Sequence, residues 1–206
     1  MQNSFRVLIP CLLILSVNQS TAQDRYHREL IAFLEKDHGI ENPSYLFSDS
    51  EQKIVEGMYI YGNSTVQTAS IAENTFTLQQ HYTVNAAGSN AWDSGAGHRN
   101  LQEVKKDDVI LVSFWARKTT QESELTFFAE DGTTFDKELD FKISFTPDWA
   151  RYFGAFKARK DYEVNGLVIG FHLASQIQSF ELAGFTALNY GDIDVTGAPS
   201  SFSPEF

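Results

Sequence analysis

The stretch Asp108–Arg117, DVILVSFWAR, decides the fold class. Its residues divide alternately into two sets. One set is uniformly apolar and is expected in a core: Ile110, Val112, Phe114 and Ala116. The other set ends in Ser113, Trp115 and Arg117. Because side chains alternate between the two faces of a β-strand, this pattern predicts a strand with one face in the core and an amphipathic opposite face.

The same period of two residues recurs along the chain from Gln52 onward. Turn signals such as Asp131-Gly132 and Asn165-Gly166 separate the segments. The further expected strands are Lys53–Tyr61, Phe76–Val84, Glu124–Glu130, Phe135–Phe145, Trp149–Ala158, Leu167–Ala174 and Gln178–Leu188. Many short strands rich in β-branched and aromatic residues are typical of an all-β sandwich or barrel.

The expected strand Leu167–Ala174 carries a single histidine, His172, flanked by small residues. Its apolar face consists of Leu167, Ile169, Phe171 and Leu173. If this strand and Asp108–Arg117 lie in one sheet, Trp115, Arg117 and His172 point to the same side. An indole ring stacks on the apolar face of a sugar, and Arg and His side chains hydrogen-bond its hydroxyl groups. The pattern therefore predicts a sugar-binding site.

Further residues are candidates for the same site. Trp92 follows a loop of small residues and is expected to form a second stacking platform at the rim. Gln176 and Gln178 are expected to add hydrogen bonds. His81 and Tyr82 are neighbours on one strand and point opposite ways, so at most one of them faces a ligand, and His81 is the candidate.

Each candidate also has a purely structural interpretation. Trp115 would cover a sheet face against an N-terminal helix, and Arg117 would pair with a neighbouring carboxylate. His172 would be a histidine whose hydrogen bonds are satisfied inside the fold. Trp149 follows Pro147-Asp148 at a strand start and is interpreted as a core residue. The sequence leaves these alternatives open.

The N-terminal segment has the features of an export signal. Arg6 precedes an apolar run over residues 7–17, and small residues precede Gln23, so residues 1–22 are expected to be a signal peptide. The lone cysteine lies in this leader, so no disulfide is expected after cleavage. The mature protein is expected to be secreted, periplasmic or at the cell surface. Residues 23–50 are expected to form a helix (Asp24–His38) and a lead-in, residues 51–191 the sandwich, and residues 192–206 a flexible tail.

Length and charge exclude several classes of function. The chain has 206 residues, too few after cleavage for a catalytic barrel of roughly 250. It carries 16 Lys and Arg against 27 Asp and Glu, a formal net charge of -11. Such a surface disfavours nucleic acid and anionic membranes, and a neutral ligand is unaffected. We expect a monomer that binds a polysaccharide.

Signatures of catalysis and of metal binding are missing from the sequence. No nucleophile elbow, phosphate loop, zinc spacing or EF-hand loop is present. Glu138 and Asp140 alternate as in jelly-roll glycosidases, but the third acidic residue of that pattern is absent. Asp107-Asp108 and Glu130-Asp131 are interpreted as turn residues, with a structural calcium as the alternative. No cofactor is expected, and nothing supports an enzyme.

Three segments resemble the strand signatures of the carbohydrate-binding modules of families 4 and 9. They are Lys105–Arg117, Thr146–Phe153 (TPDWARYF) and Gly170–Leu173 (GFHL). Trp92-Asp93 and Ile177–Gly191 resemble more closely a module found N-terminal to family-10 xylanase-type hydrolases. The similarity covers about residues 55–191. It implies a jelly-roll, galactose-binding-like β-sandwich whose groove binds β-linked glucan or xylan without catalysis, with Trp92, Trp115, Arg117 and His172 at groove positions.

The resemblance ends near Gly191, where the relatives continue into a hydrolase domain. We therefore expect a free-standing module or a truncated product rather than an enzyme. The predicted function is that of a secreted, non-catalytic module for a neutral plant-type polysaccharide, xylan or β-glucan. The alternatives are a secreted protein–protein interaction sandwich and a jelly-roll glycoside hydrolase or lyase.

Overall fold

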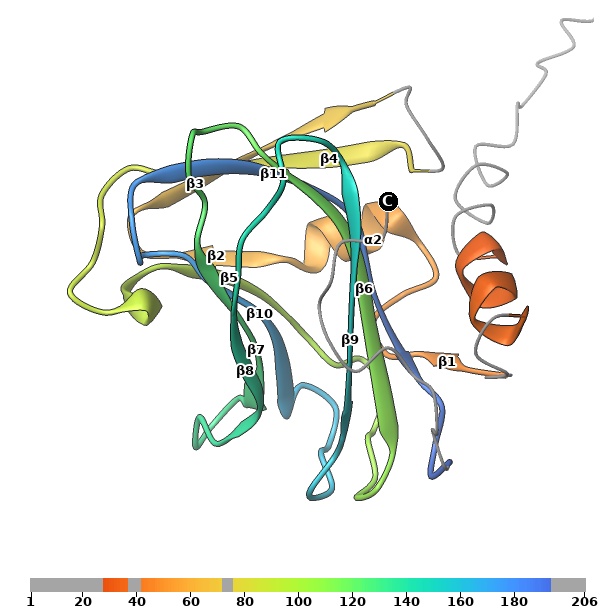
Figure 1. Ribbon diagram of the computed structural model, residues 1–206. Coiled ribbons are helices and arrows are strands. Elements are labelled where there is room, and N and C mark those ends of the chain that lie inside the picture. Colours follow the sequence, from red (N-terminus) through yellow and green to blue (C-terminus); the bar gives the residue numbers. More distant parts are fainter. Residues whose placement is uncertain (1–27, 37–41, 72–75, 194–206) are drawn as a thin grey trace, which may run out of the picture.

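The computed structural model describes residues 28–36, 42–71 and 76–193, which form two antiparallel β-sheets packed face to face (Figure 1). Sheet A has the strand order β3-β4-β11-β6-β9, with β1 also paired to β11. Its strands are β1 (Ser44–Tyr45), β3 (Ser64–Ser70), β4 (Leu78–Val84), β6 (Val109–Lys118), β9 (Ala150–Lys157) and β11 (Gln178–Asn189). The sheet therefore starts before residue 51, where the sandwich was expected to begin.

Sheet B has the strand order β2-β5-β10-β7-β8. Its strands are β2 (Tyr59–Tyr61), β5 (Gly95–Arg99), β7 (Leu125–Asp131), β8 (Lys137–Ile143) and β10 (Leu167–His172). From β4 onward the chain crosses repeatedly between the sheets, as in a jelly roll. The predicted all-β jelly-roll sandwich is confirmed.

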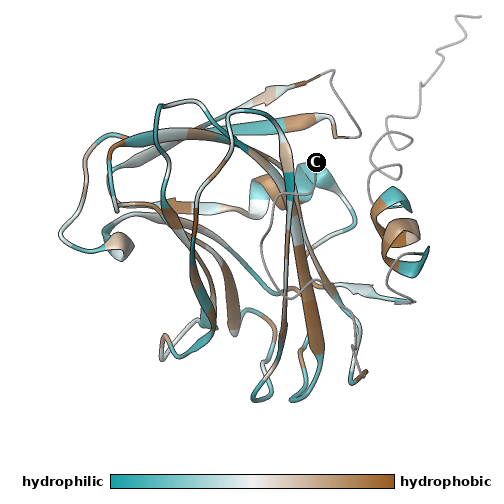
Figure 2. Cartoon of the chain, viewed as in Figure 1, coloured by the Kyte–Doolittle hydropathy of each residue, from teal (hydrophilic) through white to brown (hydrophobic). Residues whose placement is uncertain are grey.

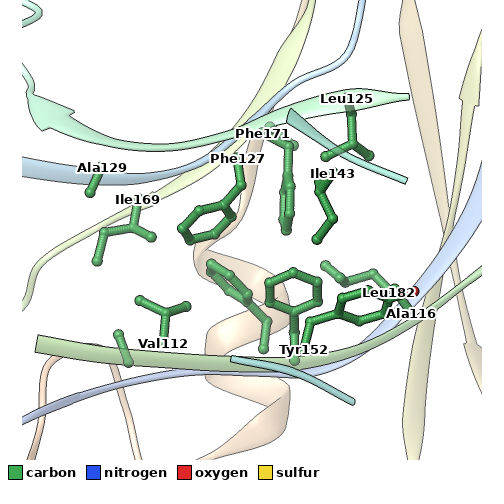
Figure 3. Close-up of a cluster of buried hydrophobic side chains, with 14 of the residues drawn as sticks. Val112, Ala116, Leu125, Phe127, Ala129, Ile143, Tyr152, Ile169, Phe171 and Leu182 are labelled. Atoms are coloured by element: carbon green, nitrogen blue, oxygen red, sulfur yellow. The ribbon is translucent and has the colours of Figure 1, made fainter. Parts of the chain in front are cut away.

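The core lies between the two sheets and has the composition that the alternation predicted. Ile110, Val112, Phe114 and Ala116 are fully buried, as are Leu167, Ile169, Phe171 and Leu173. Figure 3 shows side chains of both sheets meeting in this layer, and Figure 2 shows how apolar residues gather on strands such as β6. The Phe114 ring lies 5.2 Å from that of Phe171 and 5.5 Å from that of Tyr152. The contact of Phe114 on β6 with Phe171 on β10 joins the two sheets, and its contact with Tyr152 on β9 lies within sheet A.

A second apolar cluster lies on the opposite face of sheet A. There a helix over residues 28–36 lies beside sheet A (Figure 1). Its Leu30 and Leu34 form a buried cluster with Val109, Leu111 and Phe153. This confirms the expected N-terminal helix over its described part. The expected signal peptide and the ends of the predicted helix lie outside the described residues, as does the expected tail beyond residue 193. Among the described residues no helix is long and apolar enough to cross a membrane.

One predicted strand is wrong. Lys53–Tyr61 was expected to be a single strand, but it consists of the helix α2 (Glu51–Gly57) followed by β2. The Ser50 side chain caps the helix by accepting a hydrogen bond from the Lys53 backbone N–H. Ile54, on this helix, is buried in the core. Its neighbours Val55 and Met58 are spaced as on a helix, and over so short a segment this pattern is easily mistaken for alternation.

Besides the two-residue strand β1, two strands of the described residues were missed altogether. β3 is an edge strand whose residues are mostly exposed, so it lacks a periodic apolar signal. β5 has the sequence GAGHR and consists largely of small residues. Neither composition favours a strand by itself, and pairing with neighbouring strands decides both.

Candidate functional site

A groove with a volume of about 610 Å³ opens on the face of sheet B that is turned away from the core. Its lining residues alternate along the strands with core residues: Phe128 and Glu130 flank buried Ala129, and His172 follows buried Phe171. The lining residues are Tyr59, Tyr61, Trp92, Phe128, Glu130, Phe135, Lys137 and His172. Ring-bearing side chains dominate this set.

Two tyrosines of β2 form one side of the groove by lying over glycines of β5. Tyr61 is paired with Gly95 and Tyr59 with Gly97. A Cβ atom on Gly95 would lie 2.5 Å from Cζ of Tyr61, and one on Gly97 would lie 3.2 Å from Cζ of Tyr59. The absence of a side chain at Gly95 and Gly97 therefore lets both rings lie close to the sheet. Their centroids are 6.3 Å apart and their planes differ by 28°, so they offer an almost continuous aromatic surface.

His172 lies in the middle of the groove wall and is 6% exposed. Its ring stacks on Phe128 with a centroid distance of 4.1 Å. Nδ1 is 3.2 Å from the Tyr61 hydroxyl, and Nε2 is 3.1 Å from Nζ of Lys137. Burial, and then the ammonium of Lys137, lower the pKa of His172 to about 4. The imidazole is therefore neutral at pH 7.

Lys137 connects this histidine to a carboxylate. Its ammonium forms a short ion pair with Glu130, whose side chain is 8% exposed. The same ammonium lies 4.8 Å from the centroid of the Phe128 ring, a cation–π contact. The two charges compensate each other, so this part of the groove carries polar groups without net charge.

Trp92 forms one rim of the groove and is 62% exposed. It lies on the short helix η1 (Ala91–Asp93) in the connection from β4 to β5. The backbone on either side of it is fixed. The Ala91 carbonyl accepts a hydrogen bond from Ala174 N–H, and the Ser94 side chain donates to the Tyr61 carbonyl. A large apolar ring is thus held in solvent by a rigid support, which is a feature of binding sites rather than of cores.

Phe135 forms another part of the rim and is 66% exposed. It lies in the turn between β7 and β8 with a φ of 63°, a conformation that bulky residues rarely adopt. The carboxylate of Asp131 holds this turn by accepting hydrogen bonds from the backbone N–H groups of Thr133 and Thr134. An exposed aromatic ring in a strained backbone position points to function.

Trp115 and Arg117 do not belong to this groove. They lie on β6 in sheet A, whereas His172 lies on β10 in sheet B. The expectation that the three side chains converge is therefore wrong, because the two strands are not in one sheet. Trp115 is half-buried against the cluster beneath the helix of residues 28–36. Nε of Arg117 is 2.5 Å from Oε2 of Glu181. For both residues the structure matches the structural interpretation.

The remaining predicted residues also lie away from the groove. Nδ1 of His81 is 3.6 Å from Oε1 of Glu181, on the outer face of sheet A. Gln178 is 1% exposed, and its side-chain amide donates to the carbonyls of Glu124 and Leu173. Gln178 therefore does not add the expected hydrogen bond to the site, because its amide donor is used inside the fold. Gln176 is not among the lining residues.

Of the predicted residues, the groove brings together Trp92 and His172, and most of its lining was missed. The missed residues are Tyr59, Tyr61, Phe128, Glu130, Phe135 and Lys137. A signal for two of them was present in the alternation Tyr59-Ile60-Tyr61. It was hidden because the preceding residues were assigned to the same strand. Phe128 and Glu130 would have followed from sorting Glu124–Glu130 into its two faces.

Of the acidic residues considered for calcium, Asp108 and Asp131 hold turns, whereas Glu130 lies on β7 and lines the groove. Oδ2 of Asp108 accepts hydrogen bonds from the Lys105 backbone and the Asn189 side chain. The Asp131 carboxylate, besides holding its turn, pairs with Lys160 at 2.7 Å. Within the described ranges, no group of three or more His, Cys, Asp or Glu side chains is arranged to hold a metal ion.

Comparison with known proteins shows what the fold is. No protein-family model and no curated protein matches the sequence. Among solved structures, a family-4 carbohydrate-binding module matches with a TM-score of 0.50 and 13% identity, over 64% of this chain and 86% of that one. The family-22 xylan-binding domain of Paenibacillus barcinonensis Xyn10C matches with a TM-score of 0.50 and 15% identity, over 68% and 90%.

An arabinose-bound α-L-arabinofuranosidase matches with a TM-score of 0.55 and 10% identity, over 75% of this chain but only 27% of that one. At these identities the likeness shows the fold alone. The solved structures that this chain resembles include carbohydrate-binding modules of families 4 and 22, several of them from xylanases. The resemblance stated from the sequence is confirmed at the level of the fold.

Proposed function

We propose that this protein is a non-catalytic carbohydrate-binding module that holds a neutral β-linked polysaccharide, xylan or β-glucan, in the groove of sheet B. The observation that carries the proposal is the groove's lining, in which Tyr59, Tyr61, Trp92 and Phe135 present partly or largely exposed rings. Pyranose rings have apolar C–H faces that pack on such surfaces. Fold-level likeness to a xylan-binding domain supports this class of ligand.

The polar groups of the groove fit a neutral ligand. The hydroxyl of Tyr61 is a directional hydrogen-bond donor. Because Lys137 is paired with Glu130, the groove offers this donor without an unpaired charge beside it. Glu130 is also the one carboxylate among the described lining residues, whereas glycoside hydrolysis commonly uses two. A groove open to solvent favours modest affinity, on the order of micromolar to millimolar.

Affinity electrophoresis tests this proposal. The full chain without residues 1–22 is run in gels that contain xylan, mixed-linkage β-glucan or laminarin, beside a gel without polysaccharide. We expect retardation in at least one glycan gel and its reduction by Trp92→Ala and Tyr59→Ala. Ile177→Ala is the matched control, because Ile177 is 69% exposed but does not line the groove.

The other outcomes favour the rival functions. If no neutral glycan retards the protein, the groove is better explained as a surface that docks another protein. Release of reducing sugar by the purified protein would instead indicate a hydrolase. Retardation that Trp92→Ala and Tyr59→Ala leave unchanged would place binding elsewhere on the molecule.

We also propose that the protein is exported and acts as a monomer. The support is the composition of residues 1–22, with a basic residue, an apolar run and a small-residue cleavage motif. The measurement is the mass of the mature protein recovered outside the cytoplasm, expected to correspond to cleavage after Ala22. Size-exclusion chromatography with light scattering then gives its oligomeric state.

A further inference from the structure

A continuous chain of hydrogen bonds runs along the groove wall from a carboxylate to a phenol. Glu130 pairs with Lys137, Lys137 contacts Nε2 of His172 at 3.1 Å, and Nδ1 of His172 contacts the Tyr61 hydroxyl at 3.2 Å. The four side chains come from β7, β8, β10 and β2. Among these four hydrogen-bonded side chains, Tyr61 is the one that lies beside the exposed ring of Tyr59.

The directions of these hydrogen bonds are fixed by elementary chemistry. A protonated lysine has only donors, so Nε2 of His172 must accept. A neutral imidazole with Nε2 as acceptor carries its proton on Nδ1, which must therefore donate to the Tyr61 oxygen. Tyr61 in turn keeps its own hydroxyl proton. No acceptor for this proton is found among the described residues, and the residue lines the groove.

We propose that Lys137 and His172 are positioning residues that fix Tyr61 as a hydrogen-bond donor, so that the groove recognises a lone-pair oxygen of the bound saccharide at this point. This inference rests on the proposed function and deepens it. His172 has both nitrogens engaged and is buried, so it acts through Tyr61 and not by its own hydrogen bond to the sugar. The ligand atom concerned is a ring, glycosidic or hydroxyl oxygen that accepts.

Acid disrupts the same series of hydrogen bonds. A second proton on His172 would place an N–H at Nε2 opposite the ammonium of Lys137, and neither group can then accept. The charged and titratable groups that face the imidazole are Lys137, its partner Glu130 and the hydroxyl of Tyr61, with Tyr59 beside Tyr61. Because the pKa of His172 is lowered to about 4, the arrangement persists through neutral and mildly acidic pH and is lost below about pH 4.

The first experiment reads the tautomer without any ligand. Nitrogen-15 NMR of the imidazole side chains is recorded on the ligand-free mature chain at pH 7, and the His172 signals are assigned by their absence in His172→Gln. We expect Nδ1 to be protonated and Nε2 to be unprotonated. A His172 protonated on Nε2 would overturn the inference, whatever the binding experiments show.

The second experiment is a double-mutant cycle on glycan affinity. Tyr61→Phe is expected to weaken binding about tenfold, the typical effect of one hydrogen bond. Lys137→Met should weaken binding several-fold in the wild type but less than about twofold in the Tyr61→Phe background, because its effect passes through that hydroxyl. Lys142→Met is the control, since Lys142 lies on the same strand, pairs with Glu124 and does not line the groove.

A conservative replacement separates positioning from packing. In His172→Gln the amide oxygen accepts from Lys137 and the amide nitrogen donates to Tyr61, so binding should be largely retained at pH 7 and should no longer fall below pH 4. His172→Leu should lose the contribution of His172 to glycan binding at all pH values. Additive effects in the cycle, or equal loss in the glutamine and leucine variants, would overturn the positioning role. If the wild type binds no glycan, the proposed function fails and so does the recognition step, whereas the tautomer is still decided by the spectrum.

Discussion

The outer faces of the two sheets carry similar pairs of aromatic and charged side chains, but one face is covered by a helix and the other is open as a groove. On sheet A, the guanidinium of Arg151 lies 4.9 Å from the centroid of the Trp115 ring. On sheet B, the ammonium of Lys137 lies 4.8 Å from the centroid of Phe128. Each face also pairs a cation with a glutamate, Arg117–Glu181 on sheet A and Lys137–Glu130 on sheet B.

What differs is the cover. The helix of residues 28–36 packs Leu30 and Leu34 on sheet A, next to Trp115, whereas the face of sheet B is left as a groove with exposed rings. An aromatic ring beside a cation is therefore not by itself evidence of a binding site. It stabilises the fold where another element covers it, and it is available to a ligand where nothing does. The predictions below test whether the two faces divide these roles.

The largest expected effect is a dependence of stability on pH that originates in the groove. The pKa of His172 is lowered to about 4 in the folded state from an unperturbed 6.5, so the unfolded chain binds more protons between these values. The free energy of unfolding therefore does not depend on His172 above about pH 6.5. It falls as the pH decreases toward 4, by up to about 3 kcal/mol, because the unfolded chain takes up the proton first. Urea unfolding of the wild type and His172→Gln at several pH values between 7 and 4.5 measures this slope.

His172→Gln should retain only part of the dependence of the free energy of unfolding on pH. Burial also lowers the pKa of His98, which contributes in the same direction and is present in both proteins. The Asp131 carboxylate, with a pKa lowered to about 2 chiefly by Lys160, loses its contribution only at lower pH and does not interfere. Identical slopes in the two proteins would show that His172 is not held neutral by its surroundings.

The next effect concerns sheet A. Trp115→Ala removes a half-buried indole from the cluster beneath the helix of residues 28–36 and should lower the free energy of unfolding by about 2–3 kcal/mol. The folded variant should bind glycan as the wild type does. Chemical denaturation gives the first quantity and affinity electrophoresis below the unfolding transition gives the second. A stable Trp115→Ala protein that fails to bind would move the binding surface to sheet A.

The opposite result is expected at the rim of the groove. Trp92 is 62% exposed, so Trp92→Ala should change stability by no more than about 0.5 kcal/mol. Loss of its stacking surface should weaken glycan binding about tenfold, or about 1.4 kcal/mol. Isothermal titration calorimetry with a soluble oligosaccharide measures this difference. Unchanged affinity would contradict the role of Trp92 as a platform.

The smallest expected effect is that of removing the Arg117–Glu181 ion pair on sheet A, which is compared with removing the Lys137–Glu130 pair on sheet B. The Arg117 and Glu181 side chains are 33% and 12% exposed, so Arg117→Met should cost at most about 1 kcal/mol of stability, less at high salt. It should leave glycan affinity unchanged, in contrast to Lys137→Met. The pair of variants is compared by thermal unfolding at low and high salt and by affinity electrophoresis. A binding defect in Arg117→Met would break the division between the faces.

Only part of the site was predictable from the sequence. Trp92 could be found because it follows a loop of small residues, which indicates a large ring at a rim rather than in a core strand. The glycines of β5 give no signal of their own, and their role appears only when Tyr59 and Tyr61 are seen to lie over them. Gln178 was misjudged because a strand residue's burial depends on the neighbours that offer it carbonyl groups.

The amino-acid sequence by itself determined the sandwich and the core. In Asp108–Arg117 the side-chain period of two residues places Ile110 and Phe114 inside, whichever strands pair with it. Tertiary structure alone decided that β6 pairs with β9 and β11 while β10 pairs with β5 and β7. Alternation states which residues share a face, but not which sheet a strand joins or what covers it. Those depend on backbone pairing and packing between segments far apart in the chain, and they left one aromatic face covered and the other open.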